Sequence, residues 1–381
     1  MRIKSFSFTD PVNSWELEKS YFSDVNLLVG ISGVGKTQIL NSLLIVADIA
    51  AGRTYNGISW ELCFTSTNRS EFVWKGAFDR VEHLAEKSIS VAKFISSSEK
   101  PGITSESLTV DGQVVIERDN HGILLQGQKM PRLNASESAL SLLRCEDAVQ
   151  SAFTELSGIV SSSTVFEEHS PEMLNLTEFE IALSRLTNLD DIRRAALPTP
   201  IKLSLIYSNC PDTFAQIRDE FIDVFAQVED VAINNNEQFI NGRVVIYPTV
   251  LIKERGVSGW VNQKRLSAGM HKTFFQIAQS HLWQKGSVIL IDEFENSLGI
   301  NCISILTDII LSQAGRLQFI ITTHHPYIIN NIDQKHWKVV VRKQGKVQIM
   351  DAASLGLGKS NHEAFIQLVN SQQYIDGISV Q

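Results

Sequence analysis

The feature that most constrains this chain is a glycine-rich loop between an apolar strand-like run and an apolar helix-like run. The loop, Gly30-Ile-Ser-Gly-Val-Gly-Lys-Thr37, fits the pattern G-x-x-x-x-G-K-[ST]. Its glycines let the backbone curl until N–H groups face phosphate oxygens, and the following helix adds its positive N-terminal end. An accidental glycine turn is not expected between two such runs, Val25 to Val29 and Thr37 to Ala51. The sequence therefore predicts a phosphate-binding loop.

The residue types in this loop predict a nucleotide with Mg²⁺ as the ligand. Lys36 can reach the β- and γ-phosphates, and the hydroxyl of Thr37 can bind Mg²⁺, which prefers hard oxygen ligands. The predicted nucleotide-binding residues of the loop are Gly30, Ser32, Gly33, Val34, Gly35, Lys36 and Thr37.

A second pattern is an apolar strand that ends in two acids, Ser287-Val-Ile-Leu-Ile-Asp-Glu293. In this position Asp292 would hold the Mg²⁺ side of the site, and Glu293 would polarise the water that attacks the γ-phosphate. A strand that simply ends in solvated acids is an equally good interpretation when the pattern stands alone. The phosphate loop elsewhere in the chain favours the catalytic interpretation.

Two further patterns flank the acid strand. Leu266-Ser-Ala-Gly-Met270 precedes it by about one helix, and Phe319-Ile-Ile-Thr-Thr-His-His-Pro326 is an apolar strand that ends near His324. A serine before an amphipathic helix is also an ordinary N-cap, and that interpretation of Ser267 is compatible with a functional one. A lone histidine is more often structural, but a strand-end position after the acid strand favours a functional His324, with His325 ranked second.

The order of these patterns resembles that of the ABC superfamily of ATPases: phosphate loop, long insertion, L-S-x-G, I-L-I-D-E, then T-T-H. The resemblance implies a head-to-tail homodimer that sandwiches two ATP molecules with Mg²⁺. It also implies that Ser267 and the Gly269 amide contact the γ-phosphate held by the partner subunit's Lys36, and that His324 bonds to this phosphate and helps hold the attacking water. Met270 departs from the family, which usually has a polar residue there. The segment 296–299 takes the place of the dimer-contacting loop with a different sequence.

Within this superfamily the chain looks most like the RecF, SMC and OLD group. The features are a first strand at the chain start, a long β-plus-helix insertion, the short L-S-A-G and the H-H-P after the last core strand. Especially similar are small ATPases of bacterial anti-phage systems, including retron-associated ones. OLD enzymes carry a nuclease domain after the ATPase, whereas only about 55 residues follow His325 here. The resemblance therefore implies a separate effector protein, a nuclease or a toxin.

The expected fold class is α/β, a P-loop NTPase with an ABC-ATPase-like head. Alternating helices and strands over 266–324 predict a central parallel sheet with crossover helices. Short strands and turns over 58–130 predict an antiparallel β layer, and 135–230 reads as mostly helical. The expected lobes of this single head are a phosphate-loop lobe, a β-rich layer, a helical insertion and a lobe with the remaining motifs, at 1–57, 58–134, 135–240 and 241–381.

Charge and hydropathy indicate which kinds of partner to expect. A net charge of −8 does not indicate a DNA-coating surface, although a nucleic-acid partner stays open. No apolar run reaches the ~18–20 residues of a membrane span, and no two of the four cysteines form a metal or redox pair. We therefore expect a cytoplasmic protein without a membrane partner.

Three functions remain open at this point. The favoured one is an ATPase whose ATP-driven dimerisation, or higher assembly, controls a defence effector. A RecF-like DNA-repair ATPase is the alternative. A transporter subunit is the weakest, because that class has a much shorter segment between the phosphate loop and L-S-x-G. A glutamine-bearing loop and an adenine-contacting aromatic are not assigned: Gln126 and Gln128 read better as a solvated hairpin, and Phe8 and Trp15 as core residues.

Overall fold

The structure is a computed structural model that describes residues 1–82, 100–162, 173–343, 345–356, 358, 360–371 and 378–379. These residues divide into two compact units. We call Met1–Ser161, Gly286–Phe294 and Gln313–Gln381 the sheet unit, and Ser162–Lys285 with Glu295–Ser312 the insertion unit. Each unit is thus assembled from segments that are distant in the sequence. Within the described residues, no helix has both the length and the hydropathy that crossing a membrane requires.

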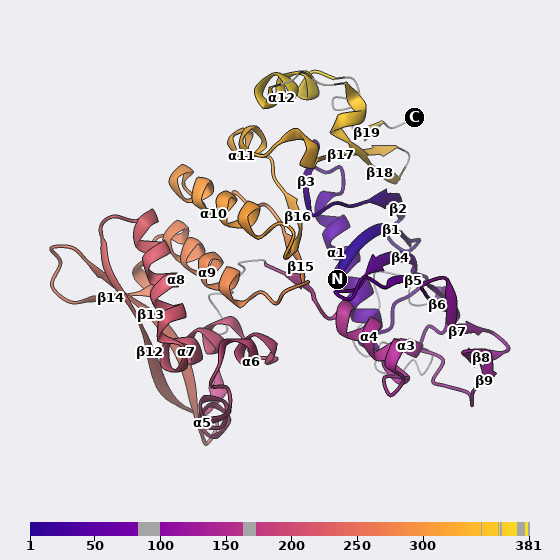
Figure 1. Cartoon of the computed structure of the whole chain (residues 1–381), viewed down its shortest axis with the longest axis horizontal. Helices are drawn as coiled ribbons and strands as arrows, with labels where there is room; N and C mark the ends of the chain where they lie inside the picture. The colour runs from indigo at the N-terminus through magenta and orange to yellow at the C-terminus, as the bar shows by residue number, and fades with distance from the viewer. Residues whose placement is uncertain are drawn as a thin grey trace. The chain divides into compact units, whose positions relative to one another are not determined.

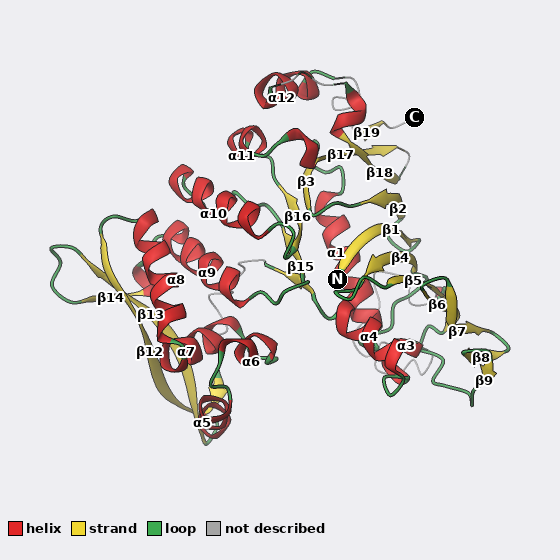
Figure 2. Ribbon diagram, in the orientation of Figure 1, coloured by secondary structure: helices red, strands yellow, loops and turns green. Residues whose placement is uncertain are grey.

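The sheet unit holds a mixed sheet that Figures 1 and 2 show with its helices. Its first strands are β1 (Arg2–Asp10), β2 (Trp15–Tyr21), β3 (Val25–Val29), β4 (Ser59–Thr65), β5 (Glu71–Phe78), β6 (Ile103–Val110), β7 (Gln113–Asp119), β8 (Gly122–Leu125) and β9 (Gln128–Lys129). The later strands are β10 (Ile159–Ser161), β15 (Val288–Ile291), β16 (Gln318–Thr322), β17 (Trp337–Lys343), β18 (Lys346–Asp351) and β19 (Ile378–Ser379). The helices are α1 (Lys36–Ala50), α3 (Ala139–Leu142), α4 (Asp147–Leu156), α11 (Pro326–Asn331) and α12 (Asn361–Val369).

Strand order joins the predicted parallel and antiparallel parts into one sheet. The order is β10-β15-β16-β3-β17-β18-β2-β1-β4-β5-β6-β7-β8-β9, and β19 pairs with β17. The neighbouring strands β10, β15, β16, β3 and β17 pair in parallel. Strands β1, β4, β5, β6, β7, β8 and β9 pair antiparallel. Strands β3, β15 and β16 are buried along their whole length, as expected for parallel strands with both faces covered. The α/β fold class, with its parallel core and antiparallel region, is therefore confirmed.

A β-bulge sets the register of the hairpin formed by β6 and β7. Its turn, Asp111-Gly112, has positive φ at both positions, 48° and 81°, as a tight two-residue hairpin turn requires. One extra residue on β7 then shifts the pairing, so that Leu108 lies opposite Ile116 and Glu106 opposite Arg118. The bulge thereby places a carboxylate and a guanidinium on directly opposite positions.

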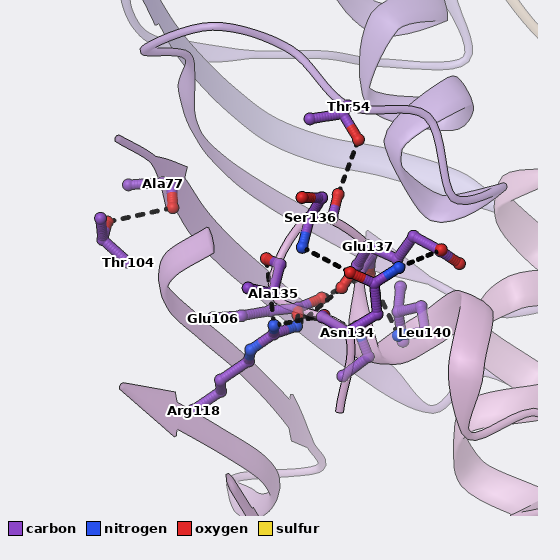
Figure 3. A network of polar contacts seen from close by, with 12 residues as sticks. Thr54, Ala77, Thr104, Glu106, Arg118, Asn134, Ala135, Ser136, Glu137 and Leu140 are labelled. Carbon is purple, nitrogen blue, oxygen red and sulfur yellow. Dashed lines mark hydrogen bonds and ion pairs between the residues drawn. The ribbon is translucent and has the colours of Figure 1, made fainter. Parts of the chain in front are cut away.

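Glu106 is the centre of a buried polar network, shown in Figure 3. Its carboxylate accepts from Trp74 Nε1 at 3.1 Å, Ser138 Oγ at 2.5 Å and the Ala139 amide at 2.8 Å. Arg118 Nη1 lies 3.6 Å from Glu106 Oε2 and donates to the Glu137 carbonyl at 2.7 Å. The network therefore ties the β6–β7 hairpin to the start of α3.

The insertion unit combines helices with a second, smaller sheet. Its helices are α5 (Leu176–Arg185), α6 (Leu189–Arg194), α7 (Thr199–Asn209), α8 (Pro211–Val224), α9 (Ala268–Leu282) and α10 (Ile300–Gln313). Its strands are β11 (Leu174–Asn175), β12 (Val228–Ile240), β13 (Arg243–Glu254) and β14 (Trp260–Asn262). The helices α7 and α8 carry a proline in their first turn, where a missing N–H is tolerated.

The expectation of a helical insertion at 135–240 was wrong in part. Helix α8 ends at Val224, and a strand of 13 residues, β12, begins at Val228. Only the first part of β12 alternates buried apolar residues, and its polar Asn234–Glu237 run stays in the sheet through backbone pairing with β13. Earlier in the region, α3 and α4 are separate helices, because the chain leaves the helical conformation between Leu142 and Asp147.

Candidate functional site

The glycine-rich loop follows β3 and leads directly into α1, as the sequence predicts. A Cβ on Gly30 would lie 2.7 Å from the Val340 carbonyl oxygen, so a larger residue would displace backbone. Gly33 and Gly35 adopt φ values of 81° and 109°, which residues with side chains rarely adopt. Gly35 caps α1 without any side-chain hydrogen bond. The first-turn N–H groups of α1 therefore suit an anion such as phosphate.

Lys36 is held inside this loop. Its side chain is 5% exposed, and Nζ donates to the carbonyl oxygens of Gly30 at 2.7 Å and Ile31 at 3.0 Å. Because the side chain is buried, the position of its ammonium group is restricted. The cation is thus kept within the loop that is predicted to curl around phosphate.

The structure brings the two predicted metal ligands together. Thr37 Oγ1 lies 3.1 Å from Asp292 Oδ1, although 255 positions separate them in the sequence. Strand β16 pairs in parallel with both β3 and β15, so the ends of all three strands lie at one edge of the sheet (Figure 1). A hydroxyl and a carboxylate side by side are hard oxygen donors of the kind that Mg²⁺ accepts, so this pair fits the ion.

Glu293 follows Asp292 at the same edge and is exposed. Its φ is 43°, in the left-handed region, and its backbone N–H donates to Thr322 Oγ1 at 2.8 Å. Sequence reasoning missed Thr322, because a threonine inside I-I-T-T looks like any other strand residue. The structure places its hydroxyl next to both acids.

The two histidines after β16 differ in what they do. His324 is exposed, one residue beyond the buried Thr323. His325 caps α11, because its Nδ1 accepts from the Tyr327 amide at 3.2 Å. A capping role for His325 agrees with ranking His324 first.

The L-S-A-G segment lies in the insertion unit. Ser267 is exposed and caps α9, with its Oγ accepting from the Met270 amide at 3.2 Å. A Cβ on Gly269 would lie 2.9 Å from the Ser297 carbonyl oxygen, so this position also favours glycine. The side chain of Met270 is buried, which suits an apolar residue at this position.

The segment that follows Glu293 is attached to the first turns of α9. Lys272 is buried, and its Nζ donates to the Asn296 carbonyl at 2.6 Å. Next to it, Ser297 has a φ of 63°. Sequence reasoning missed Lys272, although a lysine within the apolar run of α9 is a detectable signal.

The residues left unassigned by the sequence lie in a hairpin and in the core. Gln126 and Gln128 lie exposed in the β8–β9 hairpin. Phe8 and Trp15 are 2% and 4% exposed, and their ring centroids are 5.6 Å apart, so both belong to the core. The indole Nε1 of Trp15 lies 3.3 Å from where a Cβ would stand on Gly35. Trp15 therefore packs beneath the phosphate-binding loop.

Comparison with known proteins gives one family match. Residues 180–330 match the family described as "AAA domain, putative AbiEii toxin, Type IV TA system". This segment contains L-S-A-G, the acid strand and His324. No curated protein matches the chain.

Similar solved structures include three SMC head domains. One, bound to the C-terminal winged-helix domain of ScpA, is 14% identical and covers 92% of this chain and 97% of its own, with a TM-score of 0.47. A second, from Pyrococcus furiosus, has an extended coiled coil and is bound to the C-terminal domain of ScpA. It is 13% identical, the match covers 92% of this chain and 96% of that chain, and the TM-score is 0.46. The third, from Thermotoga maritima, is 12% identical, and the match covers 92% of this chain and 99% of that chain, with a TM-score of 0.42. Residues 180–330 are thus similar to an AAA domain, which agrees with the ATPase resemblance inferred from the motifs.

Proposed function

We propose that this chain binds ATP with Mg²⁺ and hydrolyses it. The observation that carries the proposal is the Thr37–Asp292 contact of 3.1 Å, next to an exposed Glu293 and beside the phosphate-binding loop. Chemistry of this kind needs phosphate binding, a hard-oxygen metal site and a base at one place. These residues supply all three at one edge of one sheet.

Each residue has a distinct role in this proposal. The loop amides and Lys36 bind and neutralise the phosphates, and Thr37 with Asp292 would hold Mg²⁺, which supplies further charge neutralisation when bound. Glu293 orients the attacking water and accepts its proton. His324 bonds to the γ-phosphate. Ser32, Val34 and the three loop glycines shape the phosphate cradle.

We further propose that two copies pair head to tail. In that dimer Ser267 and the Gly269 amide of one chain contact the nucleotide held by the partner subunit's Lys36. The exposed position of Ser267 at the start of α9, a helix of 15 residues, supports this role, because a helix N-terminus favours an anion. The four sequence segments at 1–57, 58–134, 135–240 and 241–381 would together build one such head.

The partner that this dimer controls is proposed to be a separate nuclease or toxin in the cytoplasm. The family description, which names a toxin and a type IV toxin–antitoxin system, supports an anti-phage setting. Adding DNA to the ATPase assay tests a RecF-like role: strong stimulation would favour that alternative.

The deciding experiment uses Glu293→Gln. The amide cannot take the proton of water, so we expect hydrolysis at least about 100-fold slower, with ATP affinity retained. Sedimentation with ATP should then show an accumulated dimer, and adding Ser267→Arg should return the ATP-bound protein to monomers. The matched control is Glu117→Gln, an exposed glutamate on β7. Normal turnover by Glu293→Gln would contradict the assignment of the base.

A further inference from the structure

The hydroxyl of Thr322 lies between the two acids that follow β15. Thr322 is the last residue of β16 and is 2% exposed. Its Oγ1 donates to Asp292 Oδ1 at 2.6 Å and accepts from the Glu293 amide at 2.8 Å. A hydroxyl has one donor and two acceptor positions, so both bonds can form at the same time. One side chain therefore contacts both predicted catalytic neighbours.

The backbone at Glu293 needs such support. A φ of 43° places an L-residue in the left-handed region, which is disfavoured by roughly 1–2 kcal/mol. The bond from the Glu293 amide to Thr322 Oγ1 holds one side of this turn, and the Phe294 amide donates to the Thr322 carbonyl at 3.1 Å on the other side. Strained backbone that is fixed by its surroundings is typical of functional sites.

The same hydroxyl orients the carboxylate of Asp292. Thr322 and Thr37 both donate to Oδ1, at 2.6 Å and 3.1 Å. Within the described residues, both of these bonds go to one oxygen, which leaves Oδ2 available as a hard metal ligand. Fixing the orientation of a ligating carboxylate is a usual task of residues around a metal site.

We propose that Thr322 is a positioning residue for the ATPase reaction, which fixes the metal-binding oxygen of Asp292 and the backbone of Glu293 together. The inference rests on the proposed function and adds to it a residue that touches neither phosphate nor metal. The adjacent Thr323 differs, because its Oγ1 accepts from the His325 amide at 3.1 Å. Two neighbouring threonines thus organise two different parts of the same sheet edge.

The test compares Thr322→Val with Thr322→Ser. Valine matches threonine in shape and suits a strand, so the variant removes the hydroxyl and little else, whereas serine keeps the hydroxyl. Thr307→Val is the matched control, because this buried threonine donates only to the Ile303 carbonyl of its own helix, at 2.7 Å. If Thr322→Val does not fold, Thr322→Ala removes the same hydroxyl with less bulk.

We expect Thr322→Val to lower kcat about 10- to 100-fold and to raise the Mg²⁺ concentration that gives half-maximal activity. Binding of an ATP analogue in EDTA should stay within about 2-fold of the wild type, because the phosphate-binding loop is untouched. Hydrogen exchange at the Glu293 amide should become faster in Thr322→Val and stay slow in Thr322→Ser. Thr322→Ser should also recover most of the activity, and Thr307→Val should resemble the wild type.

The outcomes separate this inference from the proposed function. A wild type that binds and hydrolyses ATP, with a Thr322→Val variant unchanged in kcat, Mg²⁺ dependence and amide exchange, overturns the role of Thr322 alone. A wild type without turnover overturns the proposed function and the role of Thr322 in it. A loss of kcat with unchanged Mg²⁺ dependence and unchanged amide exchange shows a general structural effect, and it also overturns the inference.

Discussion

Two regions of the sheet unit hold charged groups in opposite ways. At Glu106 the carboxylate is fully buried, and hydrogen-bond donors from Trp74, Ser138 and Ala139 surround it. The guanidinium of Arg118 lies beside it (Figure 3). At the predicted ATP site, Thr37, Glu293 and His324 are exposed, and Glu293 has a left-handed backbone.

The difference teaches how to separate a structural charge from a functional one. In the first region every partner of the charge comes from the fold itself, so removing it should harm stability. In the second region Thr37, Glu293 and His324 are exposed and can bind a ligand, so removing them should harm binding or turnover. Left-handed backbone occurs in both regions, but at Asp111 a two-residue hairpin turn requires it, whereas Glu293 lies in no hairpin.

The largest expected effect comes from breaking the buried network. Glu106→Gln leaves Arg118 without its carboxylate and turns an amide N–H₂ toward donors, so we expect a loss of about 3–5 kcal/mol in the free energy of unfolding. Urea denaturation followed by circular dichroism measures it. The control is Glu117→Gln on the same strand, where an exposed side chain should change stability by less than about 0.5 kcal/mol. Equal stability of the two variants would show that the network is not structural.

The opposite result is expected at the phosphate-binding loop. Lys36→Ala removes the ammonium that is proposed to neutralise the phosphates of ATP. The affinity for ATP should therefore fall at least about 100-fold, or about 2.7 kcal/mol. The free energy of unfolding without nucleotide should change less, by about 1.5 kcal/mol, because Nζ donates hydrogen bonds to the carbonyls of Gly30 and Ile31. Calorimetric titration with ATP and urea denaturation measure the two quantities. Unchanged ATP affinity would remove the phosphate loop from the proposal.

The smallest effect sharpens the comparison through pH. Burial raises the pKa of Glu106 above its usual 4.5, outweighing the hydrogen bonds from Ala139, Ser138 and Trp74 and the charge of Arg118, which lower it. In the folded state the Glu106 carboxyl group therefore stays protonated to higher pH than in the unfolded state. The contribution of this protonation to folding stability is complete below pH 4.5 and is lost as the pH rises through the higher pKa of the folded state.

The measurement is the difference in unfolding free energy between wild type and Glu106→Gln at several pH values. This difference should decline with rising pH, by at most about 1.4 kcal/mol per pH unit for one proton. A difference that rises with pH would mean that the ion pair with Arg118 outweighs burial.

Local pattern alone singles out several residues of the candidate site. Lys36, Asp292 and His324 stand out because each sits at the end of an apolar strand or in a glycine-rich loop, and such signals need no knowledge of the rest of the fold. The contact between Thr37 and Asp292 is the geometry that those motifs led us to expect. The order of helices and strands over 266–324 was predictable for the same reason.

Features that depend on register were beyond the sequence. A simple two-residue hairpin at Asp111-Gly112 would place Glu106 opposite Glu117, whereas the bulge places it opposite Arg118. The residue pattern does not predict this shift of one position. Thr322 was missed for a similar reason, because its importance arises only when β16 lies beside β15. Strand β12 was missed because its distal half is held by backbone pairing rather than by an apolar face.

The packing of Trp15 against Gly35 gives the protein a spectroscopic reporter at its glycine-rich loop. The indole ring is buried, and its N–H has no hydrogen-bond partner among the described residues. Its fluorine resonance, after incorporation of 5-fluorotryptophan, would respond to small displacements of the loop backbone against which it packs. The sequence has six tryptophans, so replacing Trp15 by phenylalanine would identify its signal. Loop rearrangement could then be followed in solution without any label on the nucleotide.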